Sequence, residues 1–147
     1  MKRFTFRLQR VLDYRETLKK EKERELALKN HELSSAEQSV HRIVEEQNSS
    51  NGVTPGVITM AEVGLVGDYL RGLQRALENQ RERVIEAQVA VEAARDAYIE
   101  KATEVKTLDT VKTKRYEEYL EDKTHHEKRQ SDDIVVQRFR FSKEGPD

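Results

Sequence analysis

Apolar side chains recur every seven residues along the second half of the chain. One ladder consists of Val63, Leu70, Leu77, Val84, Val91, Tyr98 and Val105. A second ladder follows three residues behind it and consists of Val66, Leu73, Gln80, Ala87, Ala94, Lys101 and Leu108. These are the a and d positions of a heptad repeat, which form the narrow apolar seam that one helix buries against another. The pattern predicts a coiled coil.

The first half carries the same repeat in a weaker form. Its two ladders consist of Leu12, Lys19, Leu26, Leu33 and Val40, and of Leu8, Arg15, Lys22, Lys29, Ala36 and Ile43. The cations in these ladders extend their charged ends outward along aliphatic stems. They weaken helix pairing but help to fix its register. We therefore expect a first helix over about residues 3–48.

A stretch rich in Asn, Ser, Gly and Pro separates the two halves and predicts a connector at about residues 49–58. Thr59 and Glu62 have the spacing of a capping box, and Ile58 and Val63 that of a hydrophobic staple. We expect the second helix to run over about residues 60–138 and to be followed by a flexible tail over residues 139–147.

These elements predict an all-α fold with a single domain, an antiparallel two-helix coiled-coil hairpin with a longer, overhanging C-terminal helix. A reversal near residue 53 would end the first helix opposite about residue 103. It would pair Val40 with Val66, Leu33 with Leu73, Leu12 with Ala94 and Leu8 with Tyr98. The overhang still carries apolar residues at helical spacing, which indicates either a partner surface or a frayed tail.

Composition narrows the possible functions. Of the 147 residues, 37% are charged and none is Cys, and the formal net charge is -1. No apolar run is long enough to span a membrane and no secretory signal is evident, so we expect a cytoplasmic protein. Residues 1–24 carry nine basic and four acidic side chains. That end either binds an acidic partner or an anionic membrane, or is a solvated helix face.

We expect no enzyme chemistry. The adjacent His125 and His126 point about 100° apart on a helix, so they do not favour a shared metal ion. There is no phosphate-binding loop, and a two-helix rod has no closed pocket for a catalytic set. We therefore predict no catalytic residue, cofactor, metal site or small-molecule substrate. The mixed charges also argue against binding to nucleic acid.

Two aromatic pairs stand near the chain ends, Phe4 with Phe6 and Phe139 with Phe141. In the predicted hairpin they lie far apart and do not form one site. We expect each pair to be a local anchor, either on the neighbouring helix or on a partner.

Three stretches of the sequence resemble the flagellar export protein family FliJ. They are residues 4–16 (FTFRLQRVLDYRE), residues 69–81 (YLRGLQRALENQR), and the distal stretch from Glu104 through Tyr116, Tyr119 and His126 to Asp132, Asp133 and Phe139. Their order and spacing cover nearly the whole chain. One departure is that Asp132 and Asp133 are followed by Ile134, Val135 and Val136, where the family commonly has small residues.

The resemblance implies a stalk of the flagellar type III export apparatus, with the hexameric export ATPase, the export gate in the membrane and export chaperones as partners. It implies a peripheral position at the cytoplasmic side of the cell membrane. By position in the matching stretches, the gate would bind Tyr69, Leu73, Ala76 and Gln80. Leu73 and Gln80 are also seam positions that could pack on the first helix. The ATPase ring would bind Tyr116, Tyr119, Leu120 and Phe139.

Two alternatives remain open at this point. The same rod could serve as the stalk of a virulence-type secretion system. It could also be a homodimeric coiled-coil spacer in which the apolar face of residues 105–141 pairs with a second copy.

Overall fold

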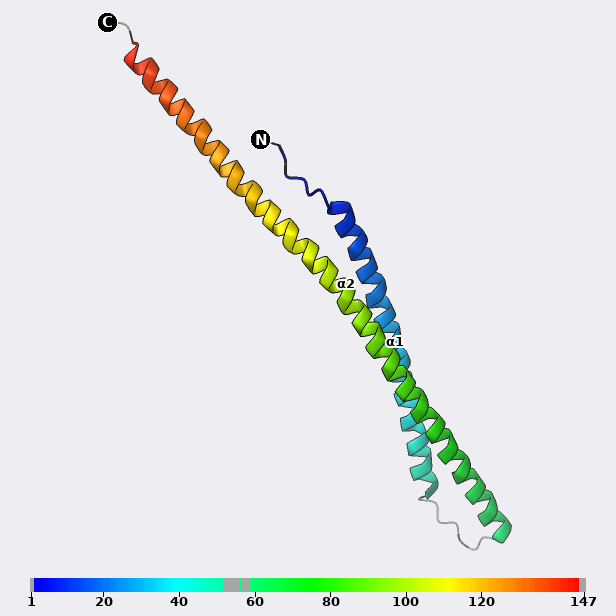
Figure 1. The fold of residues 1–147 in the computed structure, drawn as a ribbon. Coiled ribbons are helices and arrows are strands. Elements are labelled where there is room, and N and C mark those ends of the chain that lie inside the picture. The colour runs from blue at the N-terminus through cyan, green and yellow to red at the C-terminus, as the bar shows by residue number, and fades with distance from the viewer. Residues whose placement is uncertain (1, 52–55, 57–58, 146–147) are drawn as a thin grey trace. The chain divides into compact units, whose positions relative to one another are not determined.

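The computed structural model describes residues 2–51, 56 and 59–145. They form two helices, α1 (Gln9–Asn51) and α2 (Met60–Lys143), and contain no strand (Figure 1). The fold class is therefore all-α, as predicted. The chain divides into two compact units: unit 1 combines Met1–Thr17 with Ala102–Asp147, and unit 2 is Leu18–Lys101. Within each unit, a part of α1 packs antiparallel against a part of α2.

The start of α1 differs from the prediction. The helix begins at Gln9, whose backbone N–H donates to the carbonyl of Phe6 at 3.1 Å, and not near residue 3. Residues 2–8, here called the N-terminal segment, are not helical. A non-helical chain can span about 3.3 Å per residue, compared with 1.5 Å in a helix. The segment therefore reaches further along its neighbour than a helix of the same residues would.

The ends of α2 are set by local hydrogen bonds. The backbone N–H of Thr59 donates to Glu62 Oε2 at 2.9 Å, and the N–H of Glu62 donates to Thr59 Oγ1 at 3.3 Å. These two bonds are the predicted capping box. The staple partner Ile58 lies outside the described residues. At the other end the helix continues to Lys143, beyond the predicted end at residue 138.

The heptad seam forms the core of unit 2. Every a and d position from Leu70 to Lys101 is buried or half-buried, and Leu73, Leu77 and Val91 are buried. On α1, every ladder position from Lys19 to Ile43 is half-buried. Over these two stretches the periodicity therefore predicted correctly which side chains face the partner helix, whereas the ladder positions Val63 and Val66 are exposed.

The seam continues in unit 1. Leu12, which is only 2% exposed, and Val105, at 5%, are buried there. Leu108 and Lys112 are half-buried on α2, whereas Leu8 on the N-terminal segment is slightly more exposed. Each unit is thus a pair of helical stretches held together by a single line of apolar contacts.

The predicted register between the helices is wrong. Val40 lines a surface groove together with Val84, whereas its predicted partner Val66 is 47% exposed. Likewise Leu8 lies beside Val111 instead of Tyr98. Residues 32, 35 and 36, which flank Leu33, line a groove with Ala87 and Ala90, about four turns beyond Leu73.

The predicted pairing of Leu12 with Ala94 is corrected in the same way. Arg15, three residues after Leu12, pairs with Glu104, which lies ten residues beyond Ala94 on α2. The cause lies in the seam itself. A heptad seam repeats, so shifting one helix by whole heptads again brings apolar layers opposite apolar layers. The periodicity alone therefore does not select the register.

The overhang of α2 is consequently shorter than predicted. The N-terminal segment reaches Tyr119, about 16 residues beyond the predicted limit at residue 103. Within unit 1, α2 continues past this segment, as the orange and red part of the helix shows (Figure 1). Every residue from 120 to 145 is exposed.

Candidate partner-binding surfaces

Three aromatic rings of unit 1 form what we call the aromatic cluster, made of Phe4, Tyr116 and Tyr119. The ring centroid of Phe4 lies 5.1 Å from that of Tyr116 and 5.5 Å from that of Tyr119. The two tyrosine rings stack at 6.2 Å, as residues three apart on a helix face can. The hydroxyl of Tyr119 also donates to the backbone carbonyl of Lys2 at 3.0 Å. These contacts hold the N-terminal segment on α2.

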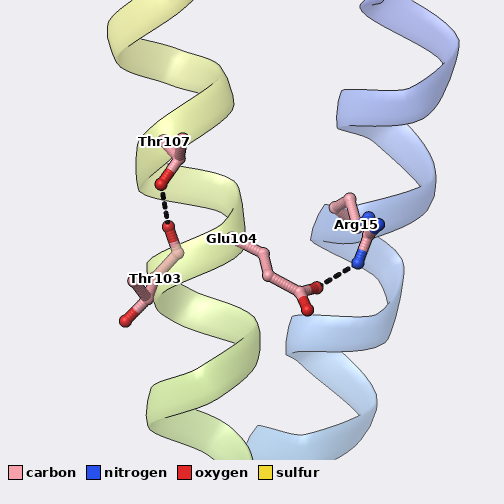
Figure 2. A network of polar contacts seen from close by, with 4 residues as sticks. All are labelled: Arg15, Thr103, Glu104 and Thr107. Carbon is pink, nitrogen blue, oxygen red and sulfur yellow. Dashed lines mark hydrogen bonds and ion pairs between the residues drawn. The ribbon is translucent and has the colours of Figure 1, made fainter.

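One ion pair joins the two helices deeper in unit 1. The guanidinium of Arg15, at a d position of α1, donates to the carboxylate of Glu104 on α2 (Figure 2). Their side chains are 36% and 31% exposed, so water screens the pair only in part. On the same turn, Thr107 Oγ1 donates to the carbonyl of Thr103 at 2.9 Å, a bond within α2 (Figure 2).

The structure divides the four residues predicted to contact the ATPase ring. Tyr116 and Tyr119 belong to the aromatic cluster, so their rings are partly covered by the chain itself. Leu120 and Phe139 are exposed, at 41% and 62%. The prediction of a ring contact stays a prediction. Tyr116 is still 45% exposed despite its ring contacts, and Leu120 and Phe139 lie beyond the N-terminal segment.

That uncovered part, residues 120–143 of α2, is here called the distal stretch. Apart from Leu120 at its start, its exposed large apolar side chains are concentrated near the end of the helix, namely Ile134, Val135, Val136, Phe139 and Phe141. The Lys143 ammonium lies 5.2 Å from the centre of the Phe139 ring. Because a helix of this kind has no neighbour to bury its apolar side chains, the distal stretch is a candidate for docking to another molecule.

A second apolar surface lies at the start of α2, in unit 2. It comprises Met60, Val63, Leu65, Val66 and Tyr69, all of which are exposed and which are spread around the first turns of the helix. We call it the α2-start patch. Sequence reasoning missed it because Val63 and Val66 were assigned to the seam. The first turns of α2 lie beyond the last seam layer that α1 covers, so these ladder positions face solvent.

Tyr69 is the member of this patch with a defined polar contact. Its hydroxyl donates to the carboxylate of Glu46 on α1. This hydrogen bond, and to a smaller extent desolvation, raises the pKa of Tyr69 above its usual value of 10.0, although a hydrogen bond with Ser50 opposes the shift. Nearby, Gln47 Nε2 donates to Gln74 Oε1 at 3.2 Å, which ties the same two helices together.

The four residues predicted to bind the export gate do not share one exposed face. Leu73 is buried and Gln80 is half-buried in the seam, where both face α1. Tyr69 and Ala76 are exposed. Leu73 and Gln80 thus lie in the seam, as the packing alternative expects, whereas Tyr69 and Ala76 are exposed, and the gate contact stays a prediction.

No group of three or more metal-ligand side chains comes together in the described part of the chain. Neither described helix is long and apolar enough to cross a membrane. Open grooves run along the described parts of the two helices.

Comparison with known proteins identifies a family. The model of the family described as "Flagellar FliJ protein" matches residues 4–144, nearly the whole chain. No significant match was found among curated proteins or among solved structures.

Proposed function

Because the chain belongs to the flagellar FliJ family, whose members are non-catalytic components of flagellar protein export, we propose that it is the stalk that couples the export ATPase to the export gate. In this role it inserts its distal stretch into the hexameric ATPase ring. It contacts the gate in the membrane and passes on export chaperones. It works at the cytoplasmic side of the cell membrane.

The observation that carries this proposal is the distal stretch. It stays helical to Lys143 although no described residue covers it, and most of its apolar side chains are concentrated near the end. Ile134 and Phe141, seven residues apart, share one helix face, and Val135 and Phe139, four apart, share the next. A broad apolar end of this kind suits a surrounding partner such as a ring better than a flat one.

The test uses the purified cognate export ATPase. Mixed with the wild-type chain, it is expected to assemble into larger oligomers and to hydrolyse ATP faster. The double variant Ile134→Glu/Phe139→Glu places charge in the contact and is expected to abolish both effects. Val89→Glu, at an exposed apolar position in unit 2, is the matched control. Wild-type chain without any effect on the ATPase would contradict the proposal.

The proposed gate contact needs its own variant. Ala76 is exposed on α2 and Tyr69 lies two turns before it, so both are available to a membrane-bound partner. Ala76→Asp is expected to weaken binding to the cytoplasmic part of the gate protein while the stimulation of the ATPase persists. If Ala76→Asp binds the gate as the wild type does, the gate contact lies elsewhere.

The exposed apolar side chains of the distal stretch also suit a second copy of the chain, as in a homodimeric spacer. Sedimentation at micromolar concentration separates the two functions. A dimer that Ile134→Glu/Phe139→Glu dissociates, together with no response of the ATPase, would favour the spacer. Because the matching family is a flagellar one, a stalk in a virulence-type secretion system is less well supported than a stalk in flagellar export.

A further inference from the structure

The N-terminal segment borders two open grooves in unit 1. The first has a volume of about 490 Å³ and an apolar floor made of Phe4, Phe6 and Leu8 from the segment and Val111 from α2. Arg7 and Arg115 also line this groove, and we call these two cations its rim. The second groove is also lined by residues of the N-terminal segment, and in addition by Arg10 and Lys112. Together we call them the basic groove.

Cations outnumber carboxylates around these grooves. Residues 2–10 and 110–116 contain seven cations and no carboxylate, the cations being Lys2, Arg3, Arg7, Arg10, Lys112, Lys114 and Arg115. Glu118 pairs with Arg115 at 3.4 Å, and Asp13 accepts a hydrogen bond from Gln9 at 2.8 Å. Asp109 and Glu117 flank the α2 stretch in sequence. An exposed ion pair such as Arg115–Glu118 is weak, so it does not cancel the positive field.

We propose that the basic groove binds a short acidic segment of another protein, in which carboxylates alternate with apolar side chains. The recessed apolar floor would take the apolar side chains and the cationic rim would take the carboxylates. Arg7 and Arg115 suit this role because a guanidinium can hold a carboxylate through two parallel hydrogen bonds.

An anionic membrane fits this surface less well. Phe4 is turned onto the tyrosines of the aromatic cluster and Phe6 is half-buried, so neither ring is free to insert between lipids. A planar bilayer also does not enter a groove, whereas a peptide side chain does. The inference goes beyond the proposed stalk function and does not depend on it, because the binding needs neither the ATPase nor the distal stretch.

The probe is a short fluorescein-labelled peptide in which Glu alternates with Leu, added to the full chain and followed by fluorescence polarisation. We expect saturable binding that weakens as salt is added. Arg7→Gln/Arg115→Gln removes both cations of the rim and is expected to weaken binding about tenfold. Arg138→Gln/Arg140→Gln makes the same change of net charge on the distal stretch and is expected to leave binding within about twofold.

Two further arms test the apolar floor. A peptide in which Glu alternates with Ser is expected to bind about tenfold more weakly, since it lacks apolar side chains. Val111→Asp places a carboxylate in the groove and is expected to abolish binding. Val111 is already 36% exposed, so this variant should keep its helicity, which circular dichroism checks.

The proposal is overturned if binding of the Glu/Leu peptide does not saturate. It is also overturned if Arg7→Gln/Arg115→Gln and Arg138→Gln/Arg140→Gln weaken binding equally. It is also overturned if vesicles of phosphatidylglycerol bind through Arg7 and Arg115 while the peptide does not, since the groove would then be a membrane contact. None of these results bears on stimulation of the ATPase, so failure here is distinct from failure of the stalk function.

Discussion

The ring of Phe4 packs edge-on against the ring of Tyr116, with 5.1 Å between the ring centroids and 69° between the ring planes. In this arrangement the positive edge of one ring meets the negative face of the other. The contact holds the non-helical N-terminal segment on α2. Because this segment supplies a wall of each of the two grooves, the contact also holds those walls in place. Phe4 therefore anchors the segment on which the basic groove depends.

Replacing this anchor should destabilise unit 1. Full truncation of a buried Phe costs about 3–5 kcal/mol, and Phe4 is only half-buried, so we expect Phe4→Ala to lower the free energy of unfolding by about 1–2 kcal/mol. Urea denaturation measures this change in the free energy of unfolding. Phe141→Ala removes the same side chain where it is 79% exposed and should change stability by less than about 0.5 kcal/mol. Equal effects of the two variants would show that Phe4 is not an anchor.

The seam and the capping box could be predicted because both are local patterns. Heptad spacing decides which face of a helix is apolar, wherever the partner stands. The Thr59–Glu62 bonds need only three residues of spacing and a following helix. The register could not be predicted in this way, since it depends on pairs far apart in sequence. Arg15 with Glu104 and Phe4 with Tyr119 are two of them.

The candidate surfaces were predictable only in part. Phe4 and Phe6 stood out as an anchor, but their partner was not evident while residues after 103 were assigned to the overhang. Tyr116 and Tyr119, three residues apart on one face, were the available signal for an aromatic partner. The α2-start patch is exposed because α1 does not cover the first turns of α2. The point at which this cover ends depends on the register between the helices, which the sequence pattern does not specify.

The Arg15–Glu104 pair should stabilise the observed register. Because both side chains are about one-third exposed, we expect a double-mutant cycle with Arg15→Met and Glu104→Gln to give a coupling free energy of about 0.5–1 kcal/mol. Added salt should reduce this coupling, as it screens the charges. A cycle with Arg115 and Glu118, a pair within one helix, serves as the comparison and should give about 0.3 kcal/mol. Zero coupling for Arg15 and Glu104 would contradict a role in register.

Loss of the capping box should loosen the start of α2 locally. Thr59→Ala removes the acceptor of the Glu62 N–H and costs about 1 kcal/mol. We therefore expect the N–H of Val63, which bonds to the carbonyl of Thr59 at 3.1 Å, to exchange about fivefold faster in NMR hydrogen exchange. Thr113→Ala removes a hydroxyl that bonds within α2 and should not speed this exchange. Unchanged exchange at Val63 in Thr59→Ala would show that the cap contributes nothing.

The hydrogen bond between Tyr69 and Glu46 makes stability depend on pH at the alkaline end. Since the carboxylate of Glu46 accepts the hydroxyl proton, the pKa of Tyr69 is raised above 10.0 in the folded chain. Below pH 10 both folded and unfolded chains keep this proton, and the contribution of the bond is fully present. As pH rises above 10, the unfolded chain loses the proton first, so stability falls until folded Tyr69 ionises as well.

Tyrosinate absorbance measures this titration directly. Subtracting the curve of Tyr69→Phe from that of the wild type isolates Tyr69, and its midpoint is expected above 10.0. Glu46→Gln removes the negative charge beside the hydroxyl and should bring the midpoint down toward 10.0. Glu45→Gln changes the neighbouring carboxylate, which pairs with His41 at 3.0 Å, and should leave the midpoint where it is. A wild-type midpoint at or below 10.0 would mean that Tyr69 and Glu46 are not bonded, and that the α2-start patch is not fixed to α1 at this point.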